Sequence, residues 1–203
     1  SYAVNRRPDL YHSYIGIGQV GDIAVSEEEI TEFIMSTASK RNDLKAIKRM
    51  DFFLKNNVDL SQSLRYQITK SRYVTKYNGG LLYKSSSNMT IYIAFLLCRE
   101  YTIKDKINII FGSKFSIENL FKYCFENNLS ETVTEQKIPI YIMNGVHDYQ
   151  TTYNQAKVYF DNLIAPEKKF YTFENSAHSP LFEEQEKFKN ILINDILKVH
   201  MGK

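Results

Sequence analysis

The chain has 203 residues, of which 43% are hydrophobic and 24% charged, a composition typical of globular proteins rather than disordered or fibrous ones. The formal net charge of +3 is too small to indicate a nucleic-acid partner. The longest apolar run, residues 91–98, is far shorter than the ~20 residues that span a bilayer, so we expect no membrane association. Without a signal-peptide pattern or metal-ligand cysteine spacing, we expect a cytoplasmic protein that holds no cofactor and no metal.

The first part of the chain predicts one buried strand. Residues 14–20 (YIGIGQV) are a short apolar run bounded by turn residues, which is typical of such a strand. Before it, residues 2–7 predict the end of a helix that Pro8 terminates.

The middle of the chain, residues 25–136, predicts an all-helical segment. Ser26 and Glu29 have the spacing of a capping box, which predicts a helix start at that point. A second helix is expected to begin at Asn42 or Asp43, and a third to cover residues 60–77.

Two further helices are expected in this segment. Residues 89–100 are apolar on nearly every side, which predicts a helix buried between other elements. Ser116 is expected to open another helix that reaches about residue 126.

The last part of the chain changes to an alternation of strands and helices. Residues 138–144 and 169–173 are short apolar runs that predict strands, with a helix over residues 151–164 between them. A long amphipathic helix is expected over residues 183–199. This βαβα order predicts a parallel sheet.

Polar side chains follow both of these strands where functional groups gather in parallel α/β sheets. Asp148 comes shortly after the first strand, and His178 follows the second. A carboxylate beside an imidazole can fix its tautomer and stabilise the imidazolium that forms during proton transfer. Taken singly, an Asp at this place is more often a turn or helix-cap residue, and a lone loop His is more often solvated. Their joint order matches the end of the chain order Ser, Asp, His of a hydrolase triad.

Residues 138–188, with the motifs GVHD at 145–148 and SAHSP at 176–180, resemble the C-terminal part of α/β-hydrolase-fold serine hydrolases, most closely the proline-iminopeptidase-like members. The first twenty residues resemble the strand that precedes the helical cap in that group. The resemblance implies a partial α/β-hydrolase fold, with a small, mostly parallel sheet of about three strands and flanking helices. Residues 1–24 and 137–203 would form the core, and residues 25–136 a helical cap. It also implies that Asp148 is the triad acid and His178 the triad base.

One part of the family pattern is missing from the chain. The nucleophile of these enzymes lies on a G-x-S-x-G turn, which occurs nowhere in these 203 residues. By the family order, this serine is expected before residue 1.

Other residues could in principle supply the missing groups. Cys98 and Cys124 are expected to be buried and inert on apolar helix faces. Ser176 and Ser179 are too close to His178 in the chain to align with its ring. Asp22, which follows the first strand, is an alternative triad acid by family analogy.

The middle segment also carries a basic stretch and a set of aromatic residues. Between residues 40 and 76 there are ten Lys or Arg and three Asp, which we interpret as a solvated helix surface rather than a nucleic-acid site. The aromatic residues could line a substrate pocket or form core; they are Phe52, Phe53, Tyr66, Tyr73 and Tyr77.

These features together predict the C-terminal portion of a peptidase- or esterase-like serine hydrolase acting on a small molecule or short peptide. The alternative is a non-catalytic interaction or regulatory module derived from a hydrolase. Because the strand between Tyr14 and Val20 would lack a neighbour on one side, we expect self-association through this edge, or its coverage by the N-terminal segment.

Overall fold

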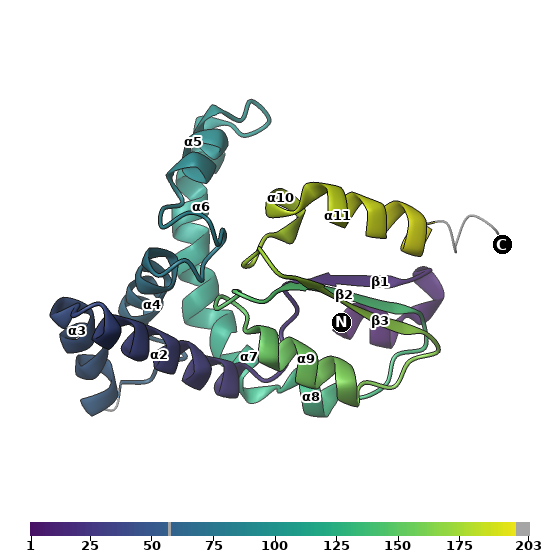
Figure 1. Cartoon of the computed structure of the whole chain (residues 1–203), viewed down its shortest axis with the longest axis horizontal. Helices are drawn as coiled ribbons and strands as arrows, with labels where there is room; N and C mark the ends of the chain where they lie inside the picture. Colours follow the sequence, from purple (N-terminus) through teal and green to yellow (C-terminus); the bar gives the residue numbers. More distant parts are fainter. Residues whose placement is uncertain (57, 198–203) are drawn as a thin grey trace.

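The computed structural model describes residues 1–56 and 58–197 and contains a small parallel sheet (Figure 1). Its strands are β1 (Tyr14–Ile17), β2 (Ile140–Gly145) and β3 (Lys168–Phe173), arranged in the order β1-β2-β3. Both pairings are parallel, with Tyr14 opposite Ile140 and Ile140 opposite Lys168. The predicted parallel α/β architecture is therefore confirmed.

Helices precede, connect and follow these strands. Helix α1 (Tyr2–Arg6) and a 3-10 turn, η1 (Pro8–Leu10), precede β1, as Pro8 predicted. Helix α9 (Tyr153–Asn162) connects β2 to β3. The chain after β3 forms α10 (Pro180–Glu183), α11 (Gln185–Asn190) and the π-helical turn η3 (Ile191–Leu197). The expected helix over residues 183–199 therefore begins earlier and is interrupted at Glu184, and its last two residues lie outside the described residues.

A long helical insertion separates β1 from β2 in the sequence. We use this name for residues 23–132, which form α2 (Ile23–Lys40), α3 (Leu44–Lys55), α4 (Leu64–Lys76), α5 (Met89–Leu97), α6 (Ile103–Ser116), the π-helical turn η2 (Ile117–Phe121), α7 (Lys122–Glu126) and α8 (Leu129–Thr132). In Figure 1 most of these helices lie to one side of the sheet, while α8 lies beneath it beside α9. No helix among the described residues is long and apolar enough to cross a membrane.

The sheet has an apolar layer on each face, because alternate residues of β2 point to opposite sides. Ile140 and Ile142 pack with Tyr159 of α9 and with Leu129 of α8. On the other face, Tyr141 and Met143 join a second cluster that includes residues of η3. Figure 1 shows the sheet between α11 above and α9 below. All six residues of β2 are buried, so this strand is the centre of the core.

The insertion has a core of its own, built by α2, α3 and α4. Ile34, Met50 and Tyr66 are fully buried there. Four of the five aromatic residues that could have lined a pocket belong to this core: Phe53, Tyr66, Tyr73 and Tyr77. Phe52 is 47% exposed. The core interpretation of this aromatic set is therefore the one that the packing supports.

The predicted helix starts in the insertion are only partly confirmed. Asp43 caps α3 as expected, since its side chain accepts a hydrogen bond from the Ala46 N–H. Helix α2 begins three residues before the predicted capping box, because Asp22 provides the cap and Ser26 lies inside the helix. Ser116 does not open a new helix; it ends α6, which begins at a capping box made by Thr102 and Asp105.

The expectation that residues 89–100 are buried is wrong. Leu96 and Leu97 of α5 are 60% and 74% exposed. Helix α5 stands at the far end of the insertion, away from the sheet and next to α6 (Figure 1), and much of its apolar surface faces solvent. Uniform hydrophobicity therefore did not predict burial here.

Candidate functional site

Asp148 is held in place by its own loop, directly after β2. Its side chain is fully buried, and Oδ1 accepts hydrogen bonds from the backbone N–H groups of Gln150 (2.8 Å) and Thr151 (3.0 Å). These two bonds use one carboxylate oxygen and leave the other one, Oδ2, for side-chain partners. The local turn chemistry expected for an Asp at this place is therefore present, and it leaves half of the carboxylate available for a partner.

That partner is His178, which lies in the loop after β3. Its Nδ1 is 2.9 Å from Oδ2 of Asp148. The imidazole side chain is 22% exposed, and in the part of the chain that is described no side chain hydrogen-bonds its Nε2. An ionised carboxylate only accepts hydrogen bonds, so the contact favours a proton on Nδ1 and a free lone pair on Nε2.

The two loops meet because β2 and β3 are adjacent and parallel. Gly145, the last residue of β2, allows the closest approach: a Cβ at this position would overlap the backbone carbonyl oxygens of Ser176 and Ala177. The His147 N–H then donates to the carbonyl oxygen of Ser176 at 3.2 Å. The glycine of the GVHD motif is thus required by backbone contact between the two loops.

The pKa of His178 is raised above its ordinary value by the balance of two effects. Burial of the ring is the largest single effect and lowers the pKa, because it penalises the charged form. The hydrogen bond and the negative charge of Asp148 act in the opposite direction and together outweigh it. The net shift shows that the imidazolium form is stabilised at this site.

A loop of the helical insertion is attached to both loops of this pair. The Tyr149 N–H donates to the carbonyl oxygen of Gly79 (2.9 Å), and the His178 N–H donates to that of Gly80 (3.2 Å). The ring of Tyr83 stacks on His147 with centroids 3.6 Å apart and planes 5° from parallel. Residues 79–83 therefore lie directly over the ends of β2 and β3.

The Glu183 carboxylate joins the loop of the insertion to the loop that carries His178. Its Oε1 accepts from the N–H groups of Tyr83 (2.8 Å) and Lys84 (3.2 Å), and its Oε2 accepts from the Ala177 N–H (2.8 Å). This residue was not predicted, because its partners lie about 100 positions away or in a loop whose shape the sequence does not show.

The other candidate residues do not contact the ring of His178. Asp22 accepts from the Val25 N–H (3.0 Å) and from Asn128 Nδ2 (2.7 Å), as a helix cap does. Ser176 donates to Glu184 at 2.7 Å. Asp148 is therefore the carboxylate that the fold brings to His178.

The expectation that both cysteines are buried is wrong. Cys98 is half-buried and hydrogen-bonds Glu100, and Cys124 is exposed. Cys98 immediately follows α5 and Cys124 lies in α7, and both segments carry apolar residues that face solvent. Within the described residues, no group of His, Cys, Asp and Glu side chains is arranged to hold a metal ion.

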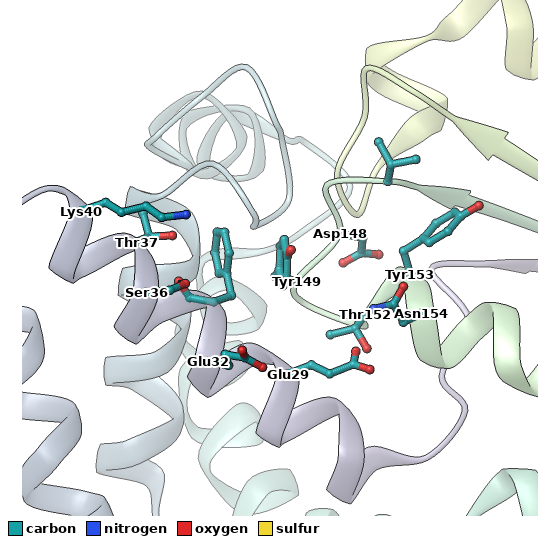
Figure 2. Close-up of a pocket in the computed structure, with 12 residues that line it drawn as sticks. Glu29, Glu32, Ser36, Thr37, Lys40, Asp148, Tyr149, Thr152, Tyr153 and Asn154 are labelled. Carbon is teal, nitrogen blue, oxygen red and sulfur yellow. The ribbon is translucent and has the colours of Figure 1, made fainter.

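A cavity of about 450 Å³ lies between α2 and the loop that carries Asp148 (Figure 2). Glu29, Glu32 and Lys40 of α2 face it from one side, and Tyr149 and Tyr153 from the other. Asp148 lines this cavity, whereas His178 is not among its lining residues. The cavity thus borders the carboxylate end of the pair.

Three of the ten basic residues between positions 40 and 76 form ion pairs with acidic residues of the insertion. Lys55 pairs with Asp51 (2.7 Å), and Lys76 pairs with Asp43 (2.5 Å). Lys70 is buried against Glu27. These ion pairs support the interpretation of a helix surface.

No family model matches the chain, but one curated protein and several solved structures are similar to it. A probable aminopeptidase, YbaC of Bacillus subtilis strain 168, is 29% identical over 195 residues, which cover 94% of this chain and 59% of the relative. The chain therefore spans less than two thirds of the length of this curated relative.

Two solved structures share the fold. VinJ superposes with a TM-score of 0.55 at 14% identity, over 97% of this chain and 61% of that one. A proline iminopeptidase from Mycobacterium smegmatis gives 0.52 at 12% identity, over 94% and 58%. With its parallel sheet and helical insertion, the chain has an α/β-hydrolase-like fold.

We expect Glu183→Gln to destabilise the chain by about 1.5–3 kcal/mol, because the amide nitrogen cannot accept the hydrogen bond that one carboxylate oxygen now accepts. Urea unfolding followed by circular dichroism measures this change. Glu186→Gln, at an exposed position in the next turn, is the control and should change the free energy of unfolding by less than about 0.5 kcal/mol. Equal effects of the two substitutions would contradict the role assigned to Glu183.

The raised pKa of His178 predicts how stability depends on pH. Because the folded protein binds this proton more tightly than the unfolded chain, the contribution is fully present below the unfolded pKa and is lost as pH rises through the folded one. The free energy of unfolding should therefore fall more steeply across this window in the wild type than in His178→Gln. Parallel pH profiles of the two proteins would show that the pair does not act in this way.

Proposed function

We propose that Asp148 and His178 are the acid and base of a serine hydrolase, and that the nucleophilic serine lies on a segment outside these 203 residues. The observation that carries the proposal is the 2.9 Å contact between Asp148 Oδ2 and His178 Nδ1 at the ends of adjacent parallel strands. The similarity to a probable aminopeptidase supports an aminopeptidase-like activity on a short peptide, with an esterase-like activity on a small molecule as the second candidate.

In this reaction His178 moves one proton in two directions. Its Nε2 takes the proton of the serine hydroxyl while the serine oxygen attacks the carbonyl carbon of the substrate. It then returns the proton to the leaving amine or alcohol, and an acyl-serine forms. Water, deprotonated by the same nitrogen, then attacks the acyl carbon, the bond to the serine oxygen breaks as His178 returns the proton to that oxygen, and the acid product leaves. Asp148 keeps the ring in the required tautomer and stabilises the imidazolium that exists between the two transfers.

The helical insertion would serve as the cap of this enzyme. Its loop over residues 79–83 is hydrogen-bonded to both loops of the pair, so substrate access and the position of His178 depend on the same segment. Exclusion of water by such a cap strengthens the electrostatic interactions of the site.

We propose that the strand that leads to the serine pairs with the free edge of β1. Within the described chain β1 pairs only with β2. An apolar cavity of about 340 Å³, lined by Ile17, Gly18 and Tyr123, lies along it. Gly18, just beyond the end of β1, is also against the His178 ring. A strand parallel to β1 would lie about 4.8 Å away and would end near this ring.

Activity-based labelling tests the proposed chemistry. The complete product of the gene that encodes this chain should react with a fluorophosphonate probe at a serine outside the 203 residues. His178→Ala should slow labelling by at least about 10³-fold, because the base is lost. His12→Ala, at an exposed position, is the control and should label normally.

Two outcomes of this experiment would contradict the proposal. Labelling of the 203-residue chain by itself, at one of its own serines, would show that the nucleophile was misplaced. An absence of labelling in the complete product would favour the non-catalytic interaction module instead.

The open edge makes a separate prediction about the 203-residue chain alone. Without the proposed strand, a second copy should pair along β1 and give oligomers in sedimentation experiments. The N–H groups of Tyr14 and Gly18 face β2, so the N–H of Ile17 faces the open edge. Ile17→Pro removes this donor and should shift the chain to monomer, whereas Ile17→Val keeps it and should not. A monomeric wild type at about 100 µM would contradict the edge assignment.

A further inference from the structure

Thr151 connects three parts of the site through a single hydroxyl oxygen. Its Oγ1 is 3.1 Å from Nδ1 of His178, 3.1 Å from Oδ2 of Asp148 and 3.0 Å from the carbonyl oxygen of Gly18. The three partners lie after three different strands, so this contact is the point at which the ends of β1, β2 and β3 meet. Thr151 is not among the functional residues that the sequence predicted.

The hydrogen inventory of these groups determines the direction of each bond. A threonine hydroxyl has one hydrogen to donate, whereas a carbonyl oxygen and an ionised carboxylate can only accept. When Nδ1 of His178 is unprotonated, it competes with the Gly18 carbonyl and the Asp148 carboxylate for the Thr151 hydrogen. When Nδ1 carries a proton, the Thr151 hydrogen is directed to Gly18 or Asp148, and the hydroxyl oxygen can accept the Nδ1 proton.

The backbone at Gly18 lies directly against the ring of His178. It has a φ of +61°, a conformation that favours glycine, and a Cβ at this position would lie 2.5 Å and 2.6 Å from Cε1 and Nδ1 of His178. The backbone after β1 is thus in contact with the imidazole ring. Its carbonyl oxygen holds the Thr151 hydroxyl on the same side of the ring.

We infer that Thr151 is a positioning residue that fixes the tautomer of His178. Thr151 and Asp148 both accept the hydrogen bond from a proton on Nδ1. The Gly18 carbonyl binds the hydroxyl hydrogen of Thr151, which is therefore less available for donation to an unprotonated Nδ1. The result is a lone pair on Nε2, the form that a general base requires. The inference deepens the proposed function and rests on it for its catalytic meaning, but the tautomer itself can be measured without any activity.

Nitrogen-15 NMR of the 203-residue chain tests the inference. Long-range proton–nitrogen correlations distinguish the two neutral tautomers, and the His178 signals are assigned by their loss in His178→Gln. Above the raised pKa, the wild type should carry its proton on Nδ1. Thr151→Val removes the hydroxyl at nearly unchanged shape and should shift the tautomer ratio toward Nε2–H by about 5-fold, the equivalent of one ordinary hydrogen bond.

Two further variants separate this role from a general effect on packing. Thr151→Ser keeps the hydroxyl and should retain the wild-type tautomer ratio. Thr152→Val is the matched control, because Thr152 is buried and its hydroxyl contacts Ser26 rather than His178. An unchanged ratio in folded Thr151→Val, or an equal shift in Thr152→Val, would overturn the inference.

Activity of the complete gene product provides the second readout. If the proposed function holds, Thr151→Val should lower kcat about 5-fold at nearly unchanged KM, with rescue by Thr151→Ser. A tautomer shift without any serine labelling would support the positioning role and contradict the hydrolase. Serine labelling that depends on His178, without a tautomer shift, would support the hydrolase and overturn the role of Thr151.

Discussion

The hydrogen bond between Asp148 and His178 is the interaction on which the rest of the site depends. It joins two loops 30 positions apart, and it requires β2 and β3 to be adjacent and parallel with their carboxyl ends at one edge. The apolar layers on both faces of β2 satisfy that requirement, since they fix the register of the sheet. A slip by one residue would move each side chain of β2 to the opposite cluster, where it would no longer fit its neighbours, and would separate Asp148 from His178.

Electrostatics explains why the pair is assembled at a buried position. A carboxylate and an imidazole in water interact weakly, because solvent screens both charges. Here Asp148 is fully buried and is held by two backbone N–H groups, so solvent screens its charge only weakly. Burial of the ring lowers the pKa of His178, but the hydrogen bond and the negative charge of Asp148 outweigh it, so the imidazolium is more stable here than in water.

The sequence predicted the strands and the Asp148–His178 pair because those features depend on local patterns and on chain order. It did not identify Thr151 or Glu183, whose roles depend on side-chain contacts with Gly18 and Tyr83, at least 100 positions away. It also predicted burial for α5, since hydropathy measures what a segment could bury and not whether another segment is present to cover it. Prediction from sequence therefore failed where burial or a residue's role depends on contacts with distant parts of the chain.

The same long-range contacts relate the helical insertion to the chemistry. Glu183 and the carbonyl groups of Gly79 and Gly80 fasten the insertion to the loops of the pair, while Gly18 and Thr151 fasten the end of β1 to the imidazole ring. His178 thus contacts Asp148, Thr151, Gly18 and Gly80, whereas no side chain of the described residues hydrogen-bonds its Nε2. A base that must exchange a proton with an incoming group needs this combination, because a mobile ring would lose the alignment and an enclosed ring would lose access.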